Sequence, residues 1–147
     1  MKLATIGYEG ATQDAVIGRL KSAGVEVLID VRAVASSRRA GFSKTVLAAS
    51  LAEAGIDYVH LRELGTPKAG RQAVRAGRVG EMRAIYEAHL ADPAAQRQFA
   101  EALDIARNRS AALLCYEADP ANCHRRIIAQ RLSAAADFEV EDLTARP

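Results

Sequence analysis

The chain has 147 residues, of which 50% are apolar and 26% charged, and its formal net charge is +2. This length predicts one domain spanning residues 1–147, and no window approaches the roughly 18 apolar residues of a membrane helix. The N-terminus lacks the basic and long apolar segments of a secretory signal. Two cysteines, eight positions apart, are too few for a disulfide scaffold, so we expect a cytoplasmic protein without membrane contact.

The positive charge is concentrated in the middle of the chain. Residues 31–80 carry nine Arg or Lys against three acidic residues, which gives this segment +6 and leaves −4 for the rest. Sixteen of the twenty basic residues are arginine, which suits bidentate recognition of phosphate or carboxylate, although an arginine-rich genome would produce the same bias. The pattern indicates a basic block on a mildly acidic body.

Apolar strand patterns alternate with helical patterns along the chain. Strands are predicted at residues 3–6, 25–31, 56–61, 111–116 and 138–143. Helices are predicted at 12–23, 43–55 and 81–91, after Asp92-Pro93, and from Asp119-Pro120 to about residue 136. Residues 62–80 are rich in Gly, Arg and Lys and are expected to form a long basic loop or short helical turn. The alternation predicts a single-domain, Rossmann-like α/β fold, with a doubly wound, mostly parallel sheet of about five strands.

Ionisable residues follow four of the predicted strands. Ligands bind at the carboxyl ends of parallel strands, because loops and helix N-termini converge there. The groups concerned are Tyr8 and Glu9; Arg32, Ser37, Arg38 and Lys44; Arg62 and Glu63; and Glu117, Cys123, His124 and Arg125. Asp30 precedes Arg32 by two residues and should orient its guanidinium if the strand stays extended. Loops are polar in any case, but four such loops at one edge favour a binding site.

Common nucleotide fingerprints are missing from this edge. The stretch Gly7-Tyr8-Glu9-Gly10 does not match GxGxxG, and its glutamate would repel a pyrophosphate. The chain has no phosphate-binding P-loop either. Nicotinamide, flavin and ordinary ATPase functions are therefore disfavoured, and the sequence identifies no cofactor.

The richest motif is CYEADPANCHRR, residues 115–126. If Asp119 caps a helix, Cys123 falls in or beside its first turn, where backbone amides and Arg125 would favour a reactive thiolate. The alternative is that Cys123 packs as a small buried residue, the role we expect for Cys115 in its apolar strand. A metal site and a regulatory disulfide are weaker alternatives, and no metal is predicted.

Four motifs in this order resemble one protein family. They are TIGYEG, LIDVRAVASSRRAGFSK, IDYVHLRELG and ALLCYEADPANCHRR, which together span nearly the whole chain. The set resembles the bacterial and archaeal family known as domain of unknown function 488, except that Ala35 stands where the family pattern has proline. The resemblance implies a compact α/β domain and a shared site at the matching positions. It implies no reaction.

The sequence therefore predicts a pocket for an anionic small molecule, such as a phosphorylated compound, a nucleotide or a nucleic-acid end. The candidate catalytic residues are Glu9, Cys123 and His124. The candidate anion-binding residues are Tyr8, Asp30, Arg32, Ser37, Arg38, Lys44, Glu117 and Arg125. The alternative is a module without catalysis that binds nucleic acid through residues 31–80. Whether the chain is an enzyme, and how it oligomerises, stay open at this point.

Overall fold

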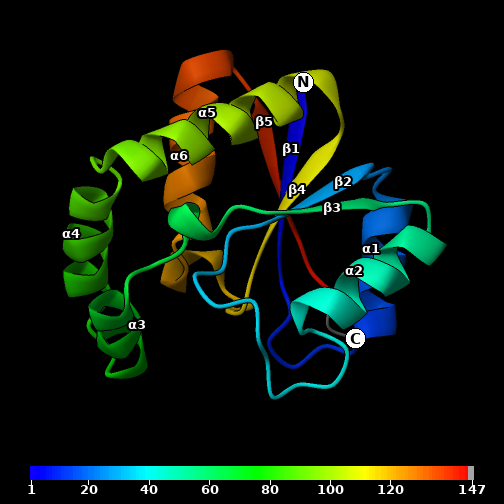
Figure 1. The fold of residues 1–147 in the computed structure, drawn as a ribbon, viewed down its shortest axis with the longest axis horizontal. Coiled ribbons are helices and arrows are strands. Elements are labelled where there is room, and N and C mark those ends of the chain that lie inside the picture. The colour runs from blue at the N-terminus through cyan, green and yellow to red at the C-terminus, as the bar shows by residue number, and fades with distance from the viewer. Residues whose placement is uncertain (146–147) are drawn as a thin grey trace.

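A computed structural model describes residues 1–145. It shows one five-stranded sheet in the order β3-β2-β4-β1-β5, in which all neighbouring strands are parallel (Figure 1). The strands are β1 (Lys2–Gly7), β2 (Val27–Asp30), β3 (Asp57–His60), β4 (Ala111–Cys115) and β5 (Glu139–Leu143). The predicted α/β class and five parallel strands are confirmed.

Six α-helices and two short 3₁₀ helices connect the described strands. The α-helices are α1 (Gln13–Ser22), α2 (Lys44–Glu53), α3 (Lys68–Arg75), α4 (Val79–His89), α5 (Pro93–Asn108) and α6 (Arg125–Ala136). The 3₁₀ helices are η1 (Arg62–Leu64) and η2 (Pro120–Asn122). Helices α1 and α2 cover one face of the sheet, and α5 and α6 cover the other (Figure 1). No helix within residues 1–145 has the length and apolar character needed to cross a bilayer.

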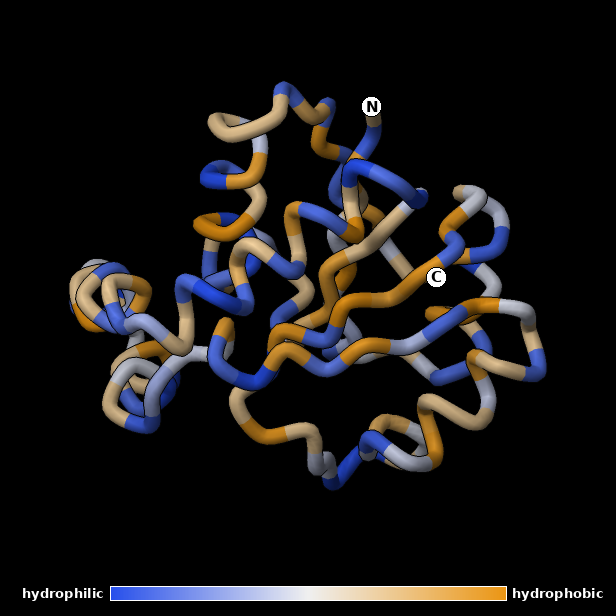
Figure 2. The backbone as a smooth tube through the Cα atoms, turned by 45° about the horizontal axis from the view of Figure 1, so that its top comes forward, coloured by the Kyte–Doolittle hydropathy of each residue, from blue (hydrophilic) through white to orange (hydrophobic). Residues whose placement is uncertain are grey.

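Two apolar cores result, one on each face of the sheet. Successive strand residues point to opposite faces, so Leu28 packs in the core under α1 and α2, while Ile29 packs in the core under α5 and α6. All four residues of β2 are buried, as expected for a strand covered on both sides. In Figure 2 the strands of the sheet cross the centre of the molecule and are largely orange, the colour of apolar residues.

The segment of residues 62–80 is predicted to form a long basic loop or a short helical turn, and the structure makes it mostly helical, so only the loop alternative was wrong. Helix α3 lies within it, and α4 already begins at Val79. The buried residues of α3 are only Gly70 and Ala73, so the helix packs through small residues and shows no stripe of large apolar ones. Gly77, with φ +79°, follows the end of α3 in the left-handed conformation that glycine adopts without strain.

The prediction of one helix from Asp119 to residue 136 was also wrong. Asp119 caps only η2, where its carboxylate accepts a hydrogen bond from the Ala121 amide at 2.9 Å. The chain is extended at Cys123 and becomes α-helical from Arg125. The helical turn that Asp119 caps ends with η2 at Asn122. Cys123 therefore lies between η2 and α6, before the first turn of α6.

Candidate functional site

The carboxyl ends of β1, β2 and β4 meet at one edge of the sheet, because β4 lies between the other two strands. A cavity of about 370 Å³ opens there. Its lining includes Tyr8, Arg32, Thr66, Arg71, Arg75, Cys115, Tyr116, Glu117 and His124. A second cavity of about 770 Å³ shares Arg71, Arg75, Tyr116 and Glu117 with it and adds Glu9 and Asp119.

Asp30 and Arg32 form a buried ion pair beneath this edge. The Asp30 carboxylate accepts hydrogen bonds from Arg32 Nε at 2.9 Å, from Arg32 Nη2 at 2.7 Å and from the Tyr58 hydroxyl at 2.5 Å. Although burial alone lowers it, the hydrogen bond and charge of Asp30 raise the pKa of Arg32. Burial and the same carboxylate raise the pKa of Tyr58. The expected orientation of Arg32 by Asp30 is present.

Protein groups accept most of the hydrogen bonds that the Arg32 guanidinium can donate. Its Nη1 donates to the Tyr8 hydroxyl at 3.1 Å and to the Phe42 carbonyl at 2.8 Å. With the two bonds to Asp30, these contacts use four of the five guanidinium N–H groups, counting partners within residues 1–145. Arg32 is 6% exposed and touches the cavity, so it offers a ligand at most one N–H.

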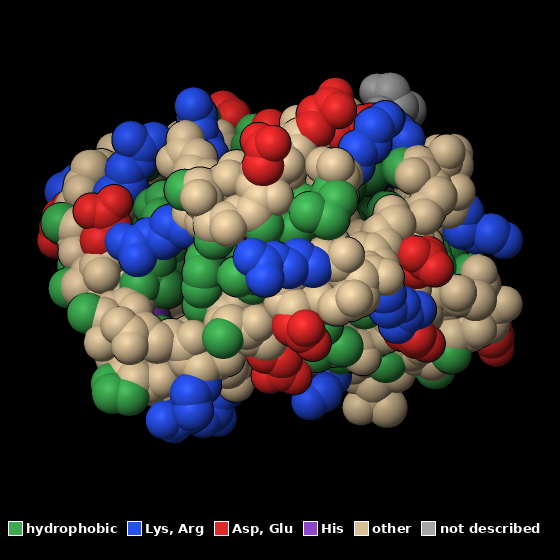
Figure 3. Space-filling model, turned by 90° about the horizontal axis from the view of Figure 1, so that it is seen from above, with side chains coloured by type: hydrophobic (Ala, Val, Ile, Leu, Met, Phe, Trp, Pro, Cys, Tyr) green, Lys and Arg blue, Asp and Glu red, His purple; other side chains and the backbone are tan. Residues whose placement is uncertain are grey.

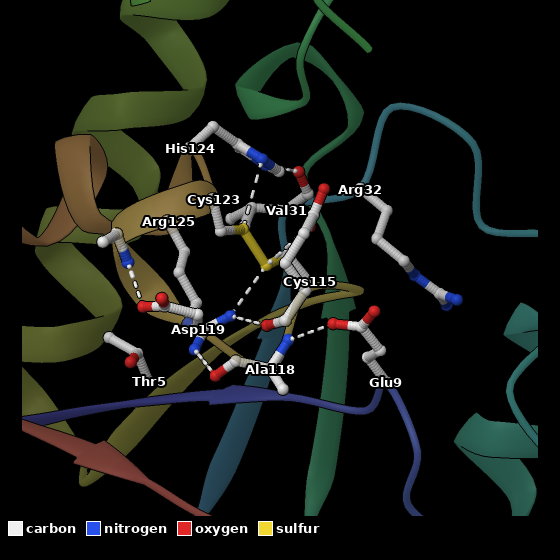
Figure 4. The surroundings of a disulfide bond; sticks show 12 residues. Thr5, Glu9, Val31, Arg32, Cys115, Ala118, Asp119, Cys123, His124 and Arg125 are labelled. Atoms are coloured by element: carbon white, nitrogen blue, oxygen red, sulfur yellow. Dashed lines mark hydrogen bonds between the residues drawn. A yellow bond between two sulfur atoms is a disulfide. The ribbon is translucent and has the colours of Figure 1, made fainter. Parts of the chain in front are cut away.

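The two cysteines are bonded to each other beside the cavity (Figure 4). Cys115 ends β4 and lines the 370 Å³ cavity, whereas Cys123 faces a separate cavity of about 130 Å³ beside α4 and α6. The sequence predicted Cys115 in the core and left Cys123 open between a reactive thiolate and a small buried residue, with a regulatory disulfide as a weaker alternative; the structure contains the disulfide. In the structure both are buried, Cys115 is the one beside the cavity, and a thiolate forms only after reduction.

His124 lies against the cysteine pair. Burial lowers its pKa to about 4, so the ring is neutral near pH 7. Its Nε2 lies 2.6 Å from the Val31 carbonyl, which can only accept, so the proton sits on Nε2. The lone pair of Nδ1 then faces Cys123 Sγ at 3.7 Å.

Arg125 lies behind the cysteines and is fully buried. Its Nη1 lies 3.0 Å from Cys115 Sγ and also donates to the Glu117 carbonyl, while Nη2 donates to the Ala118 carbonyl at 3.2 Å. Burial lowers the pKa of Arg125. Instead of reaching out to a ligand, this guanidinium supports the backbone of residues 117–118 and one sulfur.

Glu9 and Glu117 come together over the same edge, as the sequence predicted. Glu9 Oε1 accepts a hydrogen bond from the Ala118 amide at 3.0 Å and so ties the loop after β1 to the loop after β4. Glu117 lines both the 370 Å³ and the 770 Å³ cavity, and burial raises the pKa of its carboxyl group.

Three other predicted residues lie away from the cavity lining. Ser37 sits behind Tyr8, with their hydroxyl oxygens 3.4 Å apart, and its amide donates to the Ser43 hydroxyl at 3.0 Å. Arg38 and Lys44 are exposed on the loop before α2 and at the start of that helix. The loop after β2 therefore brings Arg32 to the cavity but carries Arg38 and Lys44 outward.

The structure adds two arginines that sequence analysis assigned only to a basic surface. Arg71 and Arg75 are four residues apart on α3 and line both the 370 Å³ and the 770 Å³ cavity. Residues at this spacing share one face of a helix, a signal that a helix prediction over 68–75 would have exposed. Tyr116, which is 45% exposed, lies across the cavities from them.

Comparisons with known proteins identify one family. Neither the curated proteins nor the solved structures contain a significant match to the chain. A family profile described as "Domain of unknown function DUF488" matches residues 12–132, most of the chain, including the loop after β2 and the cysteine–histidine motif. The chain therefore belongs to the DUF488 family.

Proposed function

We propose that the chain is an enzyme-like domain that binds a small phosphorylated molecule of nucleotide type over the carboxyl ends of β1, β2 and β4. The observation that carries this proposal is the pair Arg71 and Arg75, which line the 370 Å³ and 770 Å³ cavities from one face of α3. Arg71 is partly buried and uses Nη1 on the Thr66 carbonyl at 2.8 Å, so its position is held. Arg75 is exposed.

The charge of the cavity favours an anion. Arg32, Arg71 and Arg75 line the 370 Å³ cavity, and Glu117 is the acidic residue among its lining groups. Since burial raises the pKa of Glu117, its carboxyl group takes up a proton more readily and opposes an anion less. Arginine recognises phosphate through paired N–H groups, which makes phosphate a suitable ligand.

A planar group fits beside the phosphate position. Tyr116 is 45% exposed and meets Tyr8 edge-on, with ring centroids 5.3 Å apart. Exposed tyrosine rings can stack on nucleic-acid bases, and Tyr116 lines both the 370 Å³ and the 770 Å³ cavity. The ligand class proposed is therefore a phosphate joined to a base or a similar ring.

The proposed chemistry lies beside the cavity, where Cys115, Cys123 and His124 meet. Neutral His124 presents Nδ1 to Cys123 Sγ, and Arg125 approaches Cys115 Sγ, so the reduced pair has a proton acceptor and a cation beside it. Glu9 stands in the adjoining cavity as a further acid–base group. This juxtaposition supports an enzyme over a plain binding surface.

Replacing Arg71 or Arg75 by alanine is expected to weaken binding of inorganic phosphate or a mononucleotide about 10- to 100-fold, because each change removes a charge-assisted hydrogen bond. Calorimetric titration with phosphate and a mononucleotide panel measures this effect. Arg78→Ala is the matched control, because Arg78 pairs with Glu81 at 2.5 Å on the exposed surface. Equal affinities in all three variants, or no binding to the unaltered chain, would overturn the proposal.

The same variants test the nucleic-acid alternative. A protein surface that binds along a nucleic-acid backbone loses affinity for oligonucleotides steeply as the salt concentration rises. The slope of log affinity against log salt concentration is about −0.7 to −0.9 per neutralised phosphate. On the face shown in Figure 3, Lys and Arg are interspersed with Asp and Glu, which disfavours a continuous track there. If oligonucleotide binding depends steeply on salt and Arg78→Ala weakens it as much as Arg75→Ala, the proposed anion pocket is wrong and a nucleic-acid-binding surface takes its place.

A further inference from the structure

Three metal-ligating side chains converge beside the cavity. Cys115 Sγ, Cys123 Sγ and one ring nitrogen of His124 all lie within 4.8 Å of one another, and all three residues are buried. They come from the end of β4, from the segment after η2 and from the residue before α6. In Figure 4 the histidine ring and both sulfurs point toward one another.

The geometry around His124 is that of a metal ligand. A tetrahedral zinc ion holds sulfur at about 2.3 Å and nitrogen at about 2.0–2.1 Å, which places the two ligand atoms about 3.6 Å apart. The observed separation between Cys123 Sγ and His124 Nδ1 is 3.7 Å. Metal-binding histidines almost always engage their other nitrogen with a backbone carbonyl or a carboxylate, and His124 Nε2 lies 2.6 Å from the Val31 carbonyl.

The cysteine backbones also suit a longer bridge. The two Cα atoms lie 7.2 Å apart, beyond the range of about 4.4–6.8 Å usual for directly bonded cysteines. An ion between two thiolates lengthens the bridge and accommodates a wide separation. Arg125 Nη1, 3.0 Å from Cys115 Sγ, is placed to donate a hydrogen bond to a thiolate there.

We propose that, once the Cys115–Cys123 bond is reduced, Cys115, Cys123 and His124 bind one zinc ion whose fourth coordination position faces the cavity. Two thiolates and one imidazole are a donor set that zinc prefers, and three protein ligands with one open position are typical of catalytic zinc. The open position faces the cavity because Cys115 and His124 line it. Binding of the ion rests on these side chains alone, whereas its use on a bound phosphorylated substrate rests on the proposed function.

The two states of the site are linked by a balanced redox step. A phosphine reductant gives two electrons to the S–S bond and becomes a phosphine oxide, while water supplies the oxygen and the two thiol protons. Zinc then binds as both thiols lose their protons, since thiolates are the ligands. In the reverse step a peroxide takes two electrons from the two thiolates and, with two protons, is reduced to water, which restores the S–S bond and releases the ion. Zinc uptake should therefore require reduction.

Cobalt(II) reports this site directly, because thiolate ligands give it a charge-transfer band and tetrahedral geometry gives strong visible bands. The full chain, reduced with a phosphine and freed of metal, is expected to bind one equivalent of cobalt with both signatures, and zinc should displace it. The oxidised chain should bind none. Cys115→Ser and Cys123→Ser should each weaken binding about 100-fold or more and reduce the charge-transfer band.

His124→Gln should weaken cobalt binding at least about 10-fold and keep the thiolate band. His89→Gln is the matched control, because His89 Nε2 also contacts a backbone carbonyl, that of Glu63 at 2.7 Å, away from the cysteines. The proposal is overturned if the reduced chain, folded by circular dichroism and with two titratable thiols, takes up neither metal. It is equally overturned if binding survives loss of both cysteines, or if reduction unfolds the chain and zinc does not restore it.

Phosphate titration of the zinc-bound chain separates this proposal from the proposed function. Metal uptake without phosphate or nucleotide affinity would keep the zinc site and remove the anion pocket. Conversely, the chain could bind phosphate, lose that affinity in Arg71→Ala, and bind no zinc. That result would keep the anion pocket and remove the zinc site.

Discussion

Replacing Asp30 by alanine is expected to lower the free energy of unfolding by about 3–5 kcal/mol, because it leaves the Arg32 guanidinium buried without its counter-charge. Asp30 is fully buried and Arg32 is 6% exposed, so water does not replace the lost contacts. The change also removes the acceptor of the Tyr58 hydroxyl. Chemical denaturation monitored by circular dichroism measures the loss.

Asp57→Ala is the control for this prediction. Asp57 also pairs with an arginine, Arg109, at 2.7 Å, but the two side chains are 68% and 40% exposed. An exposed pair contributes about 0–1 kcal/mol, so this variant should be nearly as stable as the unaltered chain. A loss below 1 kcal/mol for Asp30→Ala would show that the buried pair does not hold the edge of the sheet together.

Replacing Gly7 by alanine is the second change with a large expected effect. A Cβ atom at this position would lie 1.8 Å from the Glu117 carbonyl oxygen and 2.8 Å from Arg125 Nη1. Relieving this steric clash requires a backbone shift. The neighbouring hydrogen bonds from the Tyr8 amide to the Cys115 carbonyl and from the Glu9 amide to the Tyr116 carbonyl oppose such a shift. We expect a loss of about 3 kcal/mol, at the upper end of overpacking effects.

The same substitution at Gly18 provides the contrast. A Cβ atom there would meet nothing within 4 Å, and Gly18 lies inside α1. Alanine should therefore stabilise the helix by about 0.5–1 kcal/mol. Thermal unfolding of both variants gives the comparison, and similar melting temperatures would contradict the close approach of β1 to the loop after β4.

The central strands β1, β2 and β4 were predictable because their residues alternate between two cores, which leaves nearly continuous apolar runs such as residues 25–31. Helix α3 was not, because it has only eight residues, its apolar face consists mainly of Ala and Gly, and it lies in a segment rich in Gly, Arg and Lys. The break between η2 and α6 was hidden for a different reason. Asp119-Pro120 opens any helical turn, and only the tertiary contacts decide that this one stops before Cys123.

The location of the candidate site was predictable, but the contacts of its residues were not. Topology brings Glu9, Arg32, Glu117 and His124 to one edge, as strand order requires. Their contacts depend on distances across the fold that a sequence does not contain. Arg125 lies under the backbone of residues 117–118 instead of in the cavity, and the eight-residue spacing of the cysteines says nothing about their meeting.

Two histidines hold consecutive backbone carbonyls just after β2. His124 contacts the Val31 carbonyl at 2.6 Å, and His60 contacts the Arg32 carbonyl at 2.7 Å. Farther along, the Ala35 carbonyl accepts the Lys44 amide at 2.7 Å and closes the loop on itself. The path of this loop is therefore set by hydrogen bonds at both ends, without the restricted φ of a proline at position 35. The exposed side chains between these anchors, such as Val34 and Arg38, can therefore be replaced without disturbing the ion pair beneath the loop.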